Sequence, residues 1–367
     1  MHKLTVIAAT LLVATSAAQA AEVFKNEQVT VDAYGRIYAG QFMGTKKDSA
    51  ATSTNDYSAK VGANQFIRFG VKADSAISGT LKAVGQYEAQ FNIGDSEKIN
   101  NVSCTTTSPS AGTYSTTCKD DKVRTRLAFA GVKSDNWGQI TFGRQKGAIS
   151  QIADWTDVSL SDGYGADALG RNADTYGTGR SSNVLKYSGK FGGTQLEANY
   201  KFDGNGTEHK DDAAANAAYG VSASYTLPMG LSAGLGYNVG VRNVSGANDA
   251  KLLVAGVKFD NKSAYAALNY GKGTDFLAVG TDHTAWEVAT GYNFVNGFGV
   301  LAMYNKQKSD TAGVKTDTVD YYTLGAQYQF NKAARVIAEY RIQNLDNNAA
   351  KAEAIKDDYQ LAARYDF

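Results

Sequence analysis

Residues that could carry out catalysis or bind metal ions are scarce in this sequence. Its 367 residues include only three histidines, two cysteines and four methionines. His209 and His283 are the two histidines outside the first 20 residues, and neither has a serine or aspartate motif beside it. Two cysteines without a nearby histidine also make a metal site unpromising. We therefore expect no enzyme, no metal and no cofactor.

Proline and long apolar runs are scarce as well. The chain has two prolines, Pro109 and Pro228, against 38 glycines and 22 tyrosines. Proline removes a donor from a strand ladder, so this composition favours a large closed sheet. Beyond the N-terminal leader, no segment offers the roughly 20 predominantly apolar residues that a transmembrane helix requires.

The first 20 residues have the features of a cleaved signal peptide. Lys3 supplies the positive start, residues 4–13 are apolar, and residues 18–20 have a small-x-small cleavage pattern. Residues 21–367 would then form a single domain. Losing Lys3 lowers the 37 basic residues to 36, which equals the number of acidic residues. Nucleic-acid binding usually needs a basic patch on a basic domain, so we expect no nucleic-acid partner.

Apolar and polar residues alternate with a period of two along much of the chain, which is typical of β-strands. Over residues 219–227, one face carries Tyr219, Val221, Ala223, Tyr225 and Leu227. A soluble sandwich also alternates, but these strands are about 9–11 residues long, which is the length that crosses a bilayer at a tilt. Their polar faces are too small and too charged to pack a dry interior, and aromatic residues lie near strand ends. A transmembrane β-barrel around water fits these features best.

We count sixteen strands along the chain and predict that they are antiparallel. An even number also fits, because both chain ends then lie on one side, and closing the sheet leaves no edge in lipid. The predicted strands begin near Val29, Gln65, Leu81, Arg124, Gly138, Arg180, Thr194, Tyr219, Gly230, Asp249, Lys262, His283, Gly297, Thr318, Ala333 and Asp357. Short periplasmic turns should alternate with longer outer loops. The predicted outer loops are 43–64, 94–122, 145–179, 204–217, 243–248, 273–282, 309–317 and 345–356. Sixteen strands enclose an aqueous channel.

The third outer loop, residues 145–179, is too long for a simple hairpin, and loops of this length are usually functional. It carries Asp157, Asp162 and Asp167 among other acids. Folded into the lumen, it would narrow the pore and present carboxylates there.

Several arginines share the polar side of their predicted strands, namely Arg36, Arg68, Arg124, Arg126 and Arg180. A charge facing lipid near the midplane costs about 2–4 kcal/mol in such barrels, so these side chains should face water. On the same alternation Leu127 should face lipid. Arg335, Glu339 and Arg341 are predicted to be lumen charges away from the constriction.

Four segments carry a resemblance to a known family. Residues 31–36, 125–133, 325–332 and 365–367 read VDAYGR, TRLAFAGVK, GAQYQFNK and YDF. Through them the whole mature chain resembles the Gram-negative general porins, and among these it looks closest to porin-like proteins of marine gammaproteobacteria. The resemblance implies a homotrimeric, water-filled diffusion pore for ions and small hydrophilic solutes. It further implies an outer membrane location in contact with lipopolysaccharide.

The resemblance also implies roles for particular residues. The family's wall arginines match Arg36, Arg68, Arg126 and Arg180, with Arg124 beside them, and its loop acids match Asp157, Asp162 and Asp167. The stretch 161–167 is shifted and lacks the family's proline. Opposed charges across a narrow aqueous gap would create a transverse field, and the balanced net charge predicts weak ion selectivity. Phe367 is implied as a signal read by the barrel-assembly machinery.

The only two cysteines of the sequence could form a disulfide. Cys104 and Cys118 lie in the same outer loop, and an oxidising periplasm favours a disulfide between them.

Two other functions remain open. One is a substrate-specific sugar or anion channel, although no aromatic path along the lumen is identifiable from the sequence. A barrel protease or phospholipase is a remoter alternative, because both need a catalytic histidine.

Overall fold

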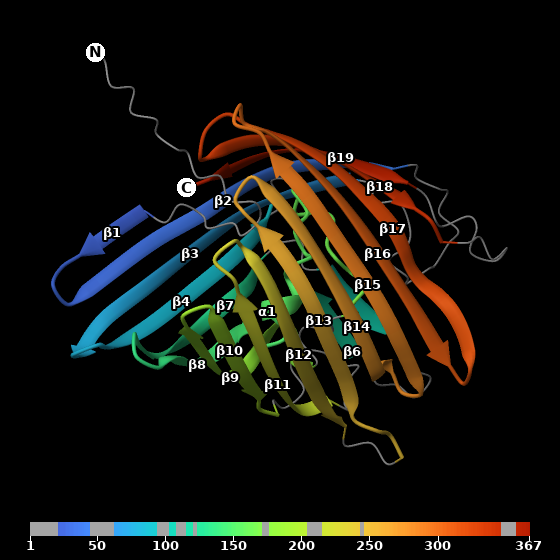
Figure 1. Cartoon of the computed structure of the whole chain (residues 1–367), viewed down its shortest axis with the longest axis horizontal. Helices are drawn as coiled ribbons and strands as arrows, with labels where there is room; N and C mark the ends of the chain where they lie inside the picture. The colour runs from blue at the N-terminus through green and yellow to red at the C-terminus, as the bar shows by residue number, and fades with distance from the viewer. Residues whose placement is uncertain are drawn as a thin grey trace.

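A closed ring of sixteen antiparallel strands dominates the computed structural model (Figure 1). The structure describes residues 21–44, 62–93, 103–107, 115–119, 123–170, 176–203, 215–242, 246–345 and 357–367. The ring consists of β2 Val29–Gly44, β3 Gly62–Ser78, β4 Leu81–Asn92, β7 Val123–Ser134, β8 Gly138–Lys146, β9 Arg180–Phe191, β10 Thr194–Lys201, β11 Ala215–Thr226, β12 Leu231–Arg242, β13 Ala250–Asp260, β14 Ala264–Ala278, β15 Thr281–Asn293, β16 Phe298–Thr311, β17 Val314–Gln329, β18 Ala334–Gln343 and β19 Asp358–Asp366. The predicted sixteen-stranded barrel is confirmed.

The ring closes between the last strand and the first. β19 pairs with β2 from Asp358 opposite Gly44 to Asp366 opposite Arg36. Every neighbouring pair around the ring is antiparallel. Closure satisfies the backbone groups that an open edge would leave without partners in lipid.

The alternation of side chains separates a lipid-facing side from a lumen side. Along β15, Trp286 and Val288 are 47% and 38% exposed on the outside, whereas Glu287 between them is completely buried on the inside. Large apolar side chains are exposed around the whole outer wall. This is the arrangement expected when hydrocarbon covers the outside of a barrel. No helix in the described residues is long and apolar enough to cross a membrane.

A short N-terminal strand, β1 (Ala21–Lys25), was not predicted and continues the line of β19 along β2 (Figure 1). Ala21 lies opposite Ala33, while the backbone of Phe367 exchanges two hydrogen bonds with Gly35, at 2.8 and 3.1 Å. One edge of β2 is thus paired in turn by β19, by Phe367 and by β1.

Two predicted outer loops are wrong in length. Residues 273–282 and 309–317 mostly belong to strands that extend beyond the predicted boundaries. β16 and β17 meet in a two-residue turn in which Ala312 and Gly313 have φ of 52° and 84°. Positive φ at both central residues is typical of the type I′ turn that suits a twisted hairpin, so the ladder continues to its tip.

Candidate functional site

The long third loop folds into the barrel, as predicted. It leaves β8 at Lys146, forms the short helix α1 (Ser150–Ala153) and returns at Arg180 to start β9. Figure 1 shows α1 inside the ring of strands. Below, the constriction loop means residues 147–179, of which 147–170 and 176–179 are described.

The constriction loop lies against the inner face of the C-terminal half of the barrel. Asn269 of β14 donates to the carbonyl of Ile152 at 3.1 Å, and Gln307 of β16 donates to that of Ala168 at 2.6 Å. The hydroxyl of Tyr321, on β17, donates to the carbonyl of Gly165 at 2.7 Å. The wall therefore satisfies backbone groups that a buried loop would otherwise leave without partners.

Glycines on this wall make room for apolar side chains of the loop. A Cβ atom added to Gly234 would lie 2.3 Å from Cδ1 of Ile152, and one added to Gly240 would lie 2.1 Å from the ring of Tyr176. Both glycines belong to the small face of β12. The expectation that this face lines water is wrong here, because the loop covers it and packs a dry interface against it.

Two buried carboxylates fix the constriction loop to the wall. Glu287 of β15 accepts hydrogen bonds from the hydroxyl of Thr156 at 2.5 Å and from the backbone of Leu169 at 2.9 Å, so it joins the two arms of the loop. Glu339 of β18 is 2% exposed and accepts a bond from the backbone of Leu160 at 2.7 Å.

Glu339 also accepts bonds from the residues on either side of Leu160. The hydroxyl of Ser159 donates at 2.8 Å, the backbone of Ser161 donates at 3.1 Å, and the hydroxyl of Ser161 donates as well. The prediction that Glu339 lies away from the constriction is therefore wrong. No sequence motif marks it, because only the path of the loop brings the two together.

Asp162 meets two of the predicted arginines. Its carboxylate lies 2.7 Å from Nη1 of Arg36 and 3.3 Å from Nη2 of Arg68. Burial by itself would raise the pKa of Asp162, but the two guanidinium groups more than offset this and lower it to about 2. The sequence prediction of charges opposed across water is wrong for this trio, because the groups are in direct contact.

Arg126 has a partner that the predicted site did not include. Its Nε lies 2.6 Å from Oε1 of Glu88 on β4. Glu88 shares the polar side of its strand with Gln86 and Gln90, so the alternation contained a signal for it. Arg36 likewise bonds Asp366 at 2.8 Å, in addition to Asp162.

A β-bulge at Arg126 changes which residues of β7 face the lumen. Glu88 pairs with Leu127, whereas the next residue, Ala89, pairs with Thr125, so Arg126 is the extra residue. Directly paired residues share a face, and Leu127 therefore points into the lumen with Glu88. The prediction that Leu127 faces lipid is wrong, because an inserted residue shifts a period-two pattern by one.

The remaining predicted charges are arranged differently. Asp157 accepts a hydrogen bond from the backbone of Ala166 at 3.3 Å, and Asp167 accepts one from Tyr321 at 3.2 Å. Among the described contacts, neither carboxylate touches a wall arginine. Arg124 and Arg180 form no ion pair with any residue in the described ranges. Of the predicted set, the structure brings Asp162 into contact with Arg36 and Arg68.

A family profile described as Gram-negative porin matches residues 8–350. The chain belongs to this family.

Individual porins align over almost the whole chain. The outer membrane porin protein OmpD of Citrobacter koseri is 29% identical, and the alignment covers 98% of this chain and 97% of that protein. Outer membrane porin N of Escherichia coli is 27% identical over 97% of each. These relatives identify the chain as an outer-membrane diffusion porin of Gram-negative bacteria.

Solved structures agree in fold. OmpF of Salmonella typhi, determined in complex with daunomycin, superimposes with a TM-score of 0.76 at 20% identity, covering 94% of this chain and 99% of that one. OmpT of Vibrio cholerae, in its trimer form, gives a TM-score of 0.64 at 18% identity over 93% and 100%. These likenesses show a shared porin barrel.

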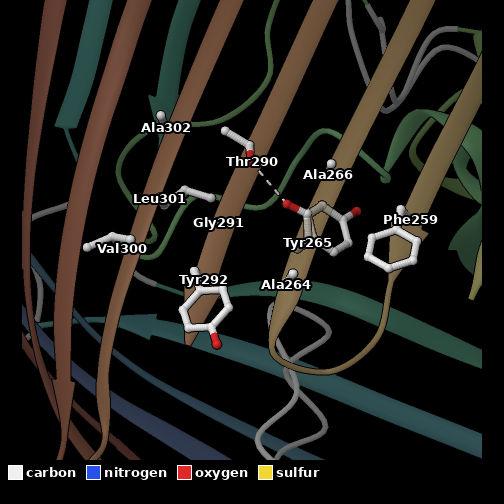
Figure 2. A pocket seen from close by; sticks show the side chains of 10 residues that line it. All are labelled: Phe259, Ala264, Tyr265, Ala266, Thr290, Gly291, Tyr292, Val300, Leu301 and Ala302. Atoms are coloured by element: carbon white, nitrogen blue, oxygen red, sulfur yellow. Dashed lines mark hydrogen bonds between the residues drawn. The ribbon is translucent and has the colours of Figure 1, made fainter. Parts of the chain in front are cut away.

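A hollow on the outer wall of the porin is a poor candidate for the functional site. It has a volume of about 410 Å³ and lies between β13 and β16, with Phe259 and Tyr292 beside small residues such as Ala264 (Figure 2). Thr290 is satisfied by donating to the carbonyl of Tyr265 at 3.2 Å. No charged residue lines it, so it suits hydrocarbon rather than a hydrated solute.

The two cysteines of the porin occupy paired positions in a separate two-stranded sheet. β5 (Ser103–Thr107) and β6 (Ser115–Lys119) form a two-stranded antiparallel sheet with Cys104 directly opposite Cys118. In the described residues no group of three or more histidine, cysteine, aspartate or glutamate side chains is placed to hold a metal ion.

Proposed function

We propose that solutes cross this porin between the constriction loop and the opposite wall, in an eyelet built by Asp162, Arg36, Arg68, Arg126 and Arg180. The observation that carries the proposal is the contact of Asp162 with Arg36 and Arg68. It ties a loop that starts at β8 to strands β2 and β3, so the loop spans the lumen at one level. Asp157 and Asp167 lie on the same loop and add negative charge to its exposed surface.

The open side of the eyelet favours anions in this proposal. The loop covers the C-terminal half of the wall, whereas the cavity on the other half is lined by five basic and two acidic residues. The Debye length at physiological ionic strength is about 8 Å, so passing ions respond to this local surplus rather than to the net charge of the chain. The balanced composition suggested weak selectivity, but it averages over charges that ions never approach.

We further propose a homotrimer. The support is family membership together with the trimer form of OmpT from Vibrio cholerae. Contact with lipopolysaccharide at the outer rim, and recognition of Phe367 by the barrel-assembly machinery, belong to the same proposal. The ring of Phe367 lies near Tyr365 on the lipid-facing side, with ring centroids 6.3 Å apart, where an assembly factor could reach it before insertion.

We also propose a disulfide between Cys104 and Cys118. Directly paired residues of an antiparallel sheet have Cα atoms about 4.5–5.5 Å apart. This lies within the range of about 4.4–6.8 Å that a disulfide requires. The bond would join β5 to β6 in the second outer loop, between β4 and β7.

Conductance across planar bilayers tests the pore and its eyelet. Purified porin should give ohmic current steps in groups of three, and a KCl gradient should give a reversal potential on the anion-selective side. Replacing Asp157 and Asp162 together by asparagine should move that potential further toward anions. Replacing Arg126 and Arg180 by glutamine should move it toward cations. Unchanged potentials in both variants would remove these residues from the eyelet.

A further inference from the structure

The open half of the lumen contains a cavity of about 500 Å³ beside the eyelet. Its basic lining residues are Arg68, Arg126, Lys146, Arg180 and Lys186. They come from β3, β7, β8 and β9, which lie close together in the sheet order β3-β4-β7-β8-β9. A cavity of roughly 300–1,000 Å³ is of the size that holds a small organic molecule.

The acids of this cavity are already occupied by cations. Glu88 bonds Arg126 at 2.6 Å and accepts a further bond from Tyr34 at 2.9 Å. Glu197 lies 2.6 Å from the amine of Lys186. Glu88 also lies 3.9 Å from Nε of Arg68, so this carboxylate is shared by two arginines.

Donors remain at the eyelet end of the cavity. Arg180 is half-buried and has no ion pair within the described parts of the chain. Arg68 is 8% exposed, and its Nε makes no hydrogen bond, although Oε1 of Glu88 lies 3.9 Å away. Lys146 lies directly opposite Arg180 on the neighbouring strand and is bonded to Asp154 at 2.5 Å. An anion with several oxygen atoms would supply the acceptors that this end lacks.

The periplasmic end of the cavity has a different character. Gln139 and Ser188 lie opposite each other on β8 and β9, and Gln195 follows on β10. These side chains are neutral donors and acceptors, suited to hydroxyl groups. Phe129, turned inward by the bulge at Arg126, adds an aromatic surface beside them.

We propose that this cavity binds phosphorylated small solutes, with the phosphate on Arg180 and Arg68 and a hydroxyl-bearing body along Gln139, Ser188 and Gln195. The guanidinium fork matches phosphate oxygens in pairs, which a halide ion cannot exploit. A phosphate dianion also balances the cation surplus better than a monoanion. This inference rests on the proposed eyelet, since Arg68 and Arg180 belong to both.

Block of the chloride current in planar bilayers tests the site. A hexose 6-phosphate added to a KCl bath of low ionic strength should reduce the current with saturation, at a half-blocking concentration in the millimolar range. Inorganic phosphate should block more weakly, and the unphosphorylated hexose should leave the current unchanged. Arg180→Gln should raise the half-blocking concentration at least fivefold.

Two further variants make the test specific. Arg335→Gln removes a lumen arginine of β18 that does not line the cavity and should keep the wild-type block. Arg180→Lys keeps the charge but cannot form paired bonds, so its block should be intermediate, and it serves if Arg180→Gln fails to insert.

Several results would overturn the site. If the current falls in proportion to the concentration of the hexose phosphate and does not saturate, the effect comes from charge alone and not from binding at a site. Equal block by the plain hexose would mean that the phosphate is not recognised. Reversal potentials in KCl alone test the eyelet separately. If Arg180→Gln shifts the potential but leaves the block unchanged, the eyelet stands and the phosphate site does not.

Discussion

Glu339 holds the part of the constriction loop next to Asp162, and its replacement by glutamine should loosen that part. Oε1 accepts a bond from Leu160, and Oε2 accepts bonds from Ser159 and Ser161. A glutamine that keeps its oxygen at the Oε2 position turns its NH₂ group toward the backbone N–H of Leu160. The bond from Leu160 is then lost, because two donors face each other. The bonds from Ser159 and Ser161 remain, but they now end on a neutral oxygen.

The size of the effect follows from these contacts. A hydrogen bond to a charged group contributes about 1.5–3 kcal/mol, against about 1 kcal/mol for a neutral one. Losing one charged bond and weakening the others should cost about 3 kcal/mol of loop docking. At about 1.4 kcal/mol per factor of ten, the undocked population of the loop tip rises roughly a hundredfold. Single-channel recordings should show noisier current with brief steps to higher conductance, and less selectivity between ions.

Glu197→Gln is the matched control for this variant. Glu197 is also a lumen glutamate, but it pairs with Lys186 and forms no hydrogen bond with the described part of the constriction loop. Its removal should shift the reversal potential without adding noise. If Glu339→Gln gives quiet wild-type conductance, the carboxylate does not hold the loop, and the reasoning from hydrogen bonds is refuted.

Three more predictions address charge, packing and covalent structure. The lowered pKa of Asp162, about 2, lies below the ordinary carboxyl value of about 3.9. Its charge, and the loop stability that depends on it, are therefore complete above about pH 4 and are lost only as the pH falls through about 2, so the contribution of Asp162 to reversal potentials should stay constant from pH 7 to about pH 4. Gly240→Ala should destabilise the porin by about 1–3 kcal/mol, seen as a lower unfolding temperature, because the new methyl group overlaps the ring of Tyr176. Under non-reducing conditions the denatured protein should contain no thiol that maleimide can label, and Cys104→Ser should expose one at Cys118.

Each of these has a result that contradicts it. If the difference in reversal potential between the wild type and Asp162→Asn shrinks between pH 7 and about pH 4, the pKa of Asp162 is not lowered. Gly85→Ala is the packing control, since a Cβ atom there meets nothing closer than 3.8 Å, and equal destabilisation of both glycine variants would refute the contact with Tyr176. Labelling of the unreduced wild type would show that Cys104 and Cys118 are not joined.

The barrel itself could be predicted because its signal is local and repeated. Each strand carries its own alternation of lipid-facing and lumen-facing residues, as in residues 219–227 and 281–293, and a pattern that recurs sixteen times survives errors in any single strand. The strand boundaries at the outer ends were harder to predict. There the strands continue beyond the bilayer, where no apolar face is required, so nothing in the alternation marks the turn at Ala312 and Gly313.

The sequence by itself also determined that the third loop is special and that Arg36, Arg68 and Asp162 belong to one constellation. It did not determine which groups touch. That depends on where the loop lies across the lumen, and the path is set by distant wall residues such as Glu339 and Gly240 that have no motif of their own. The bulge at Arg126 is a further example, because one extra residue exchanges the two faces of a strand without leaving a mark on composition. Tertiary structure alone decided these points, since they arise from contacts between residues far apart in the chain.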